Sequence, residues 1–114
     1  MAKDAMGIVD VQRGFMAADE GVRLGVAGFG ELAIQTGAQV VAPCRRLLAA
    51  AAAQRWVTFT TQDWHPAHTA HFGDPPNYRT TWPVHCVADT AGAQLHPELV
   101  VPRGTWTIHK GMEV

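Results

Sequence analysis

The chain has 114 residues, 47% of them hydrophobic and 17% charged, with a formal net charge of −1. This length allows one small domain, and the apolar content supplies a core and excludes a disordered chain. The near-neutral charge gives no sign of a nucleic-acid or membrane-surface partner. No export signal precedes the first apolar segment, and no run approaches the roughly 18 apolar residues of a membrane span. We therefore expect a cytoplasmic protein in which Cys44 and Cys86 are reduced thiols.

Three apolar segments are predicted to form β-strands: residues 5–9, 56–60 and 105–108. Between the first two, residues 40–54 are rich in alanine, leucine and arginine, which favour a helix. The order strand, helix, strand predicts a parallel α/β unit whose strands are buried on both faces.

Two stretches of the chain predict little regular structure. Residues 17–37 contain five glycines and are expected to form a long loop. Proline and glycine recur across residues 72–102, so irregular structure is expected there too.

Charged residues follow each predicted strand. Asp10, Asp63 and Lys110 lie at, or a few residues beyond, the carboxyl ends of the three strands. In open parallel sheets ligands bind at that edge, so a carboxylate and a lysine there indicate acid–base chemistry. The alternatives are a turn or helix cap for Asp10 and an ordinary surface position for Lys110.

A cluster of metal-ligating residue types follows the second predicted strand. Asp63, His65, His71 and His85 lie within 23 residues of sequence. Imidazole and carboxylate are ligands of first-row metals, and this set leaves zinc, iron, manganese and copper as candidate ions. The alternative is that these histidines are solvated on a polar loop.

Five motifs occur along the chain: Ile8-Val9-Asp10-Val11-Gln12-Arg13-Gly14-Phe15-Met16, Asp63-Trp64-His65-Pro66, Trp82-Pro83-Val84-His85-Cys86-Val87, Gly92-Ala93-Gln94-Leu95-His96-Pro97-Glu98-Leu99 and His109-Lys110-Gly111. In this order and spacing they resemble the nicotinamidase/pyrazinamidase family of isochorismatase-like cysteine hydrolases. The two motifs with the metal-ligand residues are specific to the metal-dependent amidases, whereas Val-Asp-Val-Gln is shared by the wider superfamily.

The resemblance implies a role for each matching residue. Asp10 and Lys110 match the catalytic aspartate and lysine, and Phe15 and Trp82 match the aromatic residues that sandwich the substrate's ring. Metal ligands are implied at Asp63, His65 and His85, and at His71, which matches a further ligand of some bacterial members. The implied fold is a three-layer α/β/α arrangement around a six-stranded parallel sheet.

The family's nucleophile is a cysteine some 40 residues beyond the lysine, a position that these 114 residues do not reach. Cys86 matches the cysteine that follows a ligand histidine, not the nucleophile. Residues 1–114 are therefore expected to be a partial isochorismatase-like domain with the first three strands of the sheet.

The implied function is metal-dependent hydrolysis of nicotinamide, and of pyrazinamide, to the acid and ammonia in NAD salvage. The expected partner is a small-molecule amide, with no nucleic acid or membrane. The alternatives are a catalytically silent metal-binding remnant and another isochorismatase-like amide hydrolase. Without the nucleophile, the 114-residue chain alone is expected to be inactive. The sequence leaves its oligomeric state open.

Overall fold

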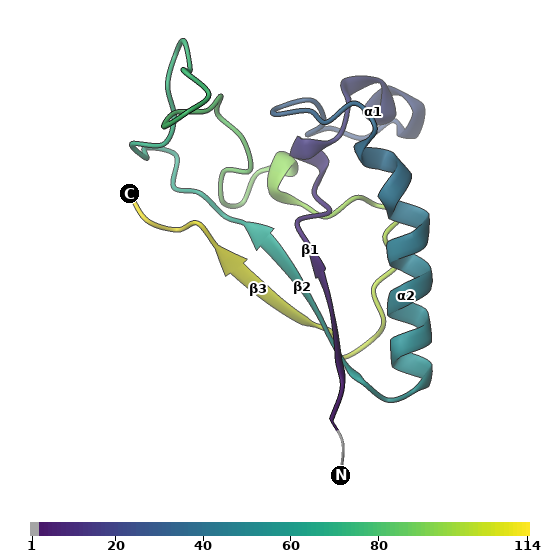
Figure 1. The fold of residues 1–114 in the computed structure, drawn as a ribbon. Helices are drawn as coiled ribbons and strands as arrows, with labels where there is room; N and C mark the ends of the chain where they lie inside the picture. The colour runs from purple at the N-terminus through teal and green to yellow at the C-terminus, as the bar shows by residue number, and fades with distance from the viewer. Residues whose placement is uncertain (1–2) are drawn as a thin grey trace.

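The computed structural model describes residues 3–114, within which three strands form one parallel sheet in the order β1-β2-β3 (Figure 1). The strands are β1 (Ala5–Val9), β2 (Val57–Asp63) and β3 (Trp106–Lys110). The predicted parallel α/β unit is confirmed. Strands β2 and β3 extend further than the apolar pattern predicted, because both continue through polar residues to the sheet edge.

Helix α2 (Val41–Ala53) connects β1 to β2 and covers one face of the sheet (Figure 1). It lies one residue inside each end of the predicted helix, and its Leu48 is completely buried. Burying a leucine of this kind contributes about 1.5–3 kcal/mol. The core lies between the sheet, helix α2 and the segment that leads into β3. Its buried residues are Ile8, Val11, Met16, Val41, Leu48 and Leu99.

The prediction of a continuous loop over residues 17–37 is wrong. Helix α1 (Ala18–Leu24) lies within it, and the 3-10 helix η2 (Gly37–Val40) begins at its end. Asp19 lies in the first turn of α1 and Arg23 in the last turn. At these positions the charge of each side chain interacts favourably with the helix dipole. Gly25 ends the helix in the left-handed conformation, with φ of 66°, so this glycine marks a helix end.

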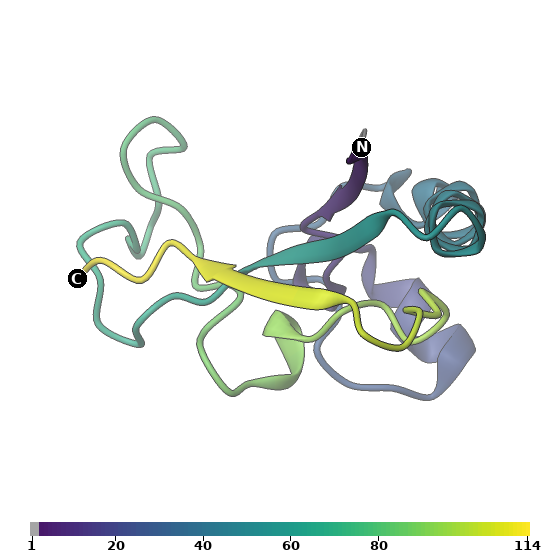
Figure 2. The same cartoon turned by 90° about the horizontal axis from the view of Figure 1, so that it is seen from below.

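Between β2 and β3 the chain is largely irregular, as predicted. The 3-10 helix η3 (Ala91–Ala93) interrupts it and packs against a second one, η1 (Arg13–Phe15). Figure 2 shows the loops after β2 extending away from the side where α2 lies. Within residues 3–114, no helix is long and apolar enough to cross a membrane.

The sheet face opposite the core carries exposed apolar side chains. Val9, Val57, Trp106 and Ile108 are 62%, 51%, 68% and 46% exposed. Parallel sheets are normally covered on both faces. Residues 3–114 supply helical cover on one of them.

Candidate metal centre and acid–base pair

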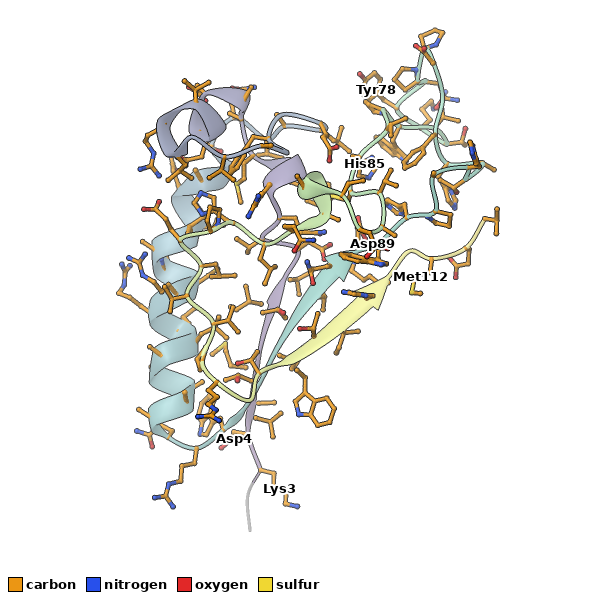
Figure 3. The ribbon with its side chains drawn as sticks, turned by 180° about the vertical axis from the view of Figure 1, so that it is seen from behind. Lys3, Asp4, Tyr78, His85, Asp89 and Met112 are labelled. Atoms are coloured by element: carbon orange, nitrogen blue, oxygen red, sulfur yellow. The ribbon has the colours of Figure 1, made fainter. Side chains whose placement is uncertain are left out.

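The charged residues that follow the strands meet at one edge of the sheet. Asp63 and Lys110 are register partners at the carboxyl ends of β2 and β3, and Asp10 follows β1 directly. Figure 3 shows His85 at this end of the molecule, with Lys3 and Asp4 at the opposite end. The parallel arrangement therefore collects acidic, basic and imidazole groups on a common support.

Lys110 bridges two carboxylates. Its Nζ donates to Asp10 Oδ2 at 2.8 Å and to Asp63 Oδ1 at 2.7 Å. Partial burial by itself would lower the pKa of Lys110, but the hydrogen bonds to Asp10 and Asp63 outweigh it and the pKa is raised. The Thr61 hydroxyl donates to Asp10 Oδ1 at 2.7 Å, so both oxygens of the Asp10 carboxylate are held.

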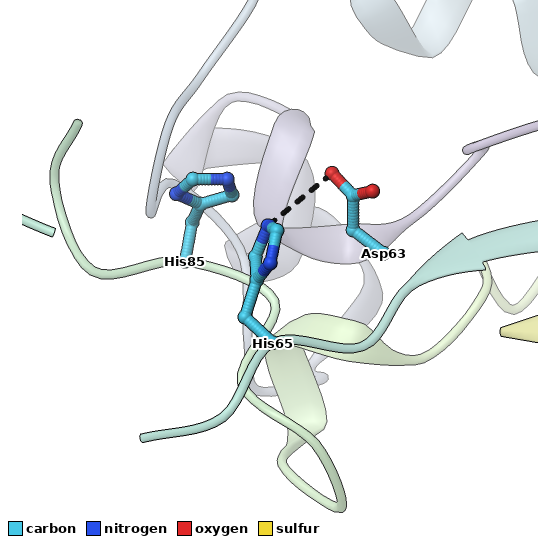
Figure 4. Close-up of side chains that lie close together, drawn as sticks. All are labelled: Asp63, His65 and His85. Atoms are coloured by element: carbon cyan, nitrogen blue, oxygen red, sulfur yellow. Dashed lines mark ion pairs between the residues drawn. The ribbon is translucent and has the colours of Figure 1, made fainter. Parts of the chain in front are cut away.

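Asp63, His65 and His85 form a close group. Each offers a ligand atom, and these atoms all lie within 4.8 Å of one another (Figure 4). His65 Nε2 lies 3.5 Å from Asp63 Oδ2, the oxygen that Lys110 leaves free. Ligand atoms bound tetrahedrally to one ion at about 2.0–2.2 Å lie roughly 3.3–3.6 Å apart, a separation that His65 Nε2 and Asp63 Oδ2 already have.

Backbone carbonyls orient both imidazole rings of this group. His65 Nδ1 lies 2.7 Å from the oxygen of Gly111, and His85 Nδ1 lies 2.6 Å from the oxygen of Pro83. Because a carbonyl oxygen only accepts, each Nδ1 carries the proton, and Nε2 of the neutral ring has a free lone pair. Two imidazole nitrogens and one carboxylate oxygen therefore stand close together, an arrangement that fits a bound cation.

A cavity of about 410 Å³ opens beside this group. His71 lines it and is exposed, but it is not part of the close group of three, so its role as a ligand stays a prediction. Phe15 and Trp82 also line the cavity, and their place on either side of a flat ring stays a prediction. Tyr78 packs beside Trp82, with ring centroids 6.1 Å apart and ring planes at 77° to each other.

Two residues to which the sequence assigned no role hold the site together. Gln12 is completely buried, and its side chain donates to Asp63 O at 2.9 Å and accepts from Asp63 N at the same distance. Gly111 has φ of 68°, and a Cβ there would lie 2.7 Å from His65 Cε1. Both stand in motifs that carry the family resemblance, Gln12 two residues after Asp10 and Gly111 directly after Lys110, and that position is the signal for them.

Neither cysteine is placed as a nucleophile within residues 3–114. Cys86 is completely buried, and its Sγ lies 3.6 Å from the oxygen of Gly92. Burial, and then the nearby carboxylates of Glu31 and Asp63, raise the pKa of the Cys86 thiol far above its usual value. Cys44 lies in α2, and burial raises the pKa of its thiol as well.

Comparisons with known proteins bear on the family and the fold of the chain. The family model of the isochorismatase domain matches residues 4–112. The nicotinamidase/pyrazinamidase of Mycobacterium tuberculosis is 39% identical over 95 residues, covering 83% of this chain and 45% of the relative. The nicotinamidase of Escherichia coli is 30% identical over 123 aligned positions, covering 97% and 53%.

A solved structure shares the fold. The pyrazinamidase of Pyrococcus horikoshii in complex with zinc matches with a TM-score of 0.77 and 26% identity, covering 98% of this chain and 54% of that one. The chain thus spans about half the length of the relatives that it matches.

Proposed function

The chain belongs to the isochorismatase family, and from that premise we propose that it is the part of a nicotinamidase that carries the acid–base pair and the metal site. The observation that carries this proposal is the contact of Lys110 with both Asp10 and Asp63, because it joins the acid–base pair to the candidate metal ligands. The two curated relatives named above support the substrate class.

The reaction proposed for the complete enzyme is hydrolysis of the carboxamide of nicotinamide, or of pyrazinamide, to the acid and ammonia. A thiolate attacks the amide carbon, and the tetrahedral oxyanion collapses to a thioester with loss of ammonia. Asp10 accepts the thiol proton and delivers it to the leaving nitrogen, while the positive charge of Lys110 favours the thiolate. Water then hydrolyses the thioester and releases the acid.

Asp63, His65 and His85 are the proposed metal ligands, with His71 as a further candidate from the cavity wall. The ion, which is zinc, iron or manganese, supplies Lewis-acid polarisation when bound. Phe15 is proposed to contact one face of the substrate ring and Trp82 the other. Nicotinate as product places the reaction in NAD salvage, and we expect it to occur in the cytoplasm.

The thiol is proposed to come from a polypeptide segment other than residues 1–114. Residues 1–114 would then form a partial hydrolase domain. The buried position of Cys86 and the place of Cys44 on α2 support this. The same observation favours one alternative, a metal-binding remnant without amidase activity. The partial nicotinamidase and the metal-binding remnant differ in one outcome. Only the partial nicotinamidase should hydrolyse nicotinamide when a polypeptide supplies the remaining half of the domain.

The test is nicotinamide hydrolysis by a longer polypeptide that includes such a segment. Asp10→Ala should abolish ammonia release, because the group proposed to accept the thiol proton is gone, while zinc content stays near that of the unsubstituted enzyme. Asp19→Ala, an exposed acid in α1, is the matched control and should leave both unchanged. Turnover that survives in Asp10→Ala would remove Asp10 from the mechanism.

A further inference from the structure

Glu31 makes a contact next to the candidate metal site that the proposed reaction does not use. Its Oε1 accepts a hydrogen bond from the backbone nitrogen of Cys86 at 2.9 Å. Cys86 directly follows His85 and has φ of 47°, in the left-handed region. Residues other than glycine adopt this backbone conformation at a cost of about 1–2 kcal/mol. A partner on its N–H helps to hold this unfavourable conformation, and with it the direction in which the chain leaves His85.

The backbone of Cys86 also joins the two segments that carry histidines of the close group. His65 N donates to Cys86 O at 3.0 Å, and Ala88 N donates to His65 O at 2.8 Å. His85 and His65 therefore depend on one short backbone bridge. Glu31 anchors that bridge from a third segment, 55 residues earlier in the chain.

The surrounding backbone leaves room for the Glu31 side chain. A Cβ on Gly92 would overlap its carboxylate, and a Cβ on Gly14 would lie 2.5 Å from Oε1. The backbone on either side of Glu31 is also held, since Gly30 N donates to Met16 O and Leu32 N donates to Gly14 O, at 2.8 and 2.9 Å. Glu31 is thus enclosed where the segments around residues 14, 86 and 92 meet.

We propose that Glu31 is a positioning residue for the metal site, which sets the orientation of His85 through the Cys86 backbone N–H. The inference rests on the proposed metal site. Partners one step away from a ligand typically change metal affinity by roughly 10–100-fold when they are removed. The contribution of Glu31 comes from its hydrogen bond, so an uncharged acceptor of the same length replaces it.

Two conservative variants separate the hydrogen bond from the charge. Glu31→Gln keeps an acceptor oxygen at the same reach and loses the charge, whereas Glu31→Asp keeps the charge on a side chain one methylene shorter. Zinc affinity of the purified chain is measured by competition with a chromophoric chelator, and folding by circular dichroism. Asp19→Asn, an exposed acid that loses its charge, is the control.

Glu31→Gln and Asp19→Asn should bind zinc within about threefold of the unsubstituted chain, and Glu31→Asp should bind roughly 10–100-fold more weakly. Undiminished affinity in Glu31→Asp overturns the proposal, as does an equal loss in a folded Glu31→Gln. If Glu31→Asp does not fold, Gly92→Ala displaces the same carboxylate sterically. It should weaken zinc binding, and unchanged affinity would count against the proposal.

The control also separates this inference from the proposed function. If substitution of His85 leaves the zinc affinity of the unsubstituted chain and of Asp19→Asn unchanged, the proposed metal site is refuted. The role of Glu31 is then refuted with it. If both lose zinc on substitution of His85 but Glu31→Asp does not weaken binding, only the role of Glu31 is refuted.

Discussion

Replacement of Gly111 by alanine tests how the backbone after β3 supports the proposed metal site. Gly111 has φ of 68°, and its carbonyl oxygen accepts a hydrogen bond from His65 Nδ1. An alanine pays about 1–2 kcal/mol for the left-handed conformation. Its methyl would also lie 2.7 Å from His65 Cε1 and 2.9 Å from Nδ1, closer than such atoms approach, so the ring must move.

Gly25→Ala is the matched control, because Gly25 has nearly the same φ, 66°, and a methyl group there would meet no described atom within 4 Å. Both variants should lose about 1–2 kcal/mol of unfolding free energy from backbone strain. Only Gly111→Ala should also lose zinc affinity, by roughly 10–100-fold, or about 1.4–2.7 kcal/mol of binding free energy.

Chemical denaturation gives the first quantity and chelator competition the second. Equal zinc affinity in Gly111→Ala, Gly25→Ala and the unsubstituted chain would refute the reasoning. It would mean that His65 tolerates displacement or does not bind the metal.

Three further predictions concern the rest of the chain. Cys86 should react with a disulfide reagent only after unfolding, while partly buried Cys44 reacts in the native chain; rapid labelling of both would contradict the burial of Cys86. Burial lowers the pKa of His96 below its usual value, although Glu20 opposes this, so the unfolded chain takes up the proton first as the pH falls. The contribution of neutral His96 to the free energy of unfolding should thus be fully present above about pH 6.5 and be lost as the pH falls towards the lowered pKa. Urea midpoints measured at several pH values should therefore fall less with falling pH in His96→Gln than in the unsubstituted chain. An equal fall in both would exclude His96 as the source of the pH dependence. The 114-residue chain should self-associate through its exposed sheet face and show no amidase activity. Sedimentation velocity should find less association for Trp106→Lys than for the unsubstituted chain. A monomeric unsubstituted chain would argue against association through this face.

Much of the fold follows from local sequence. The apolar strands and the alanine-rich helix depend on short-range patterns, so their order and parallel pairing were predictable, to within a few residues at the ends. Helix α1 was missed because its glycines outweighed its charged turns. Its last turn also contacts a distant segment through the ion pair of Arg23 with Glu98, 75 residues later, which no local pattern contains.

The site divides in the same way. By itself, the sequence determined which chemical groups stand at the strand ends, because parallel strands bring Asp10, Asp63 and Lys110 to one edge of the sheet. Tertiary structure alone decided that His71 stays outside the close group and that Glu31 contacts Cys86. Both outcomes depend on how loops distant in sequence pack together, and that packing is set by the combined burial and backbone hydrogen bonding of the whole chain.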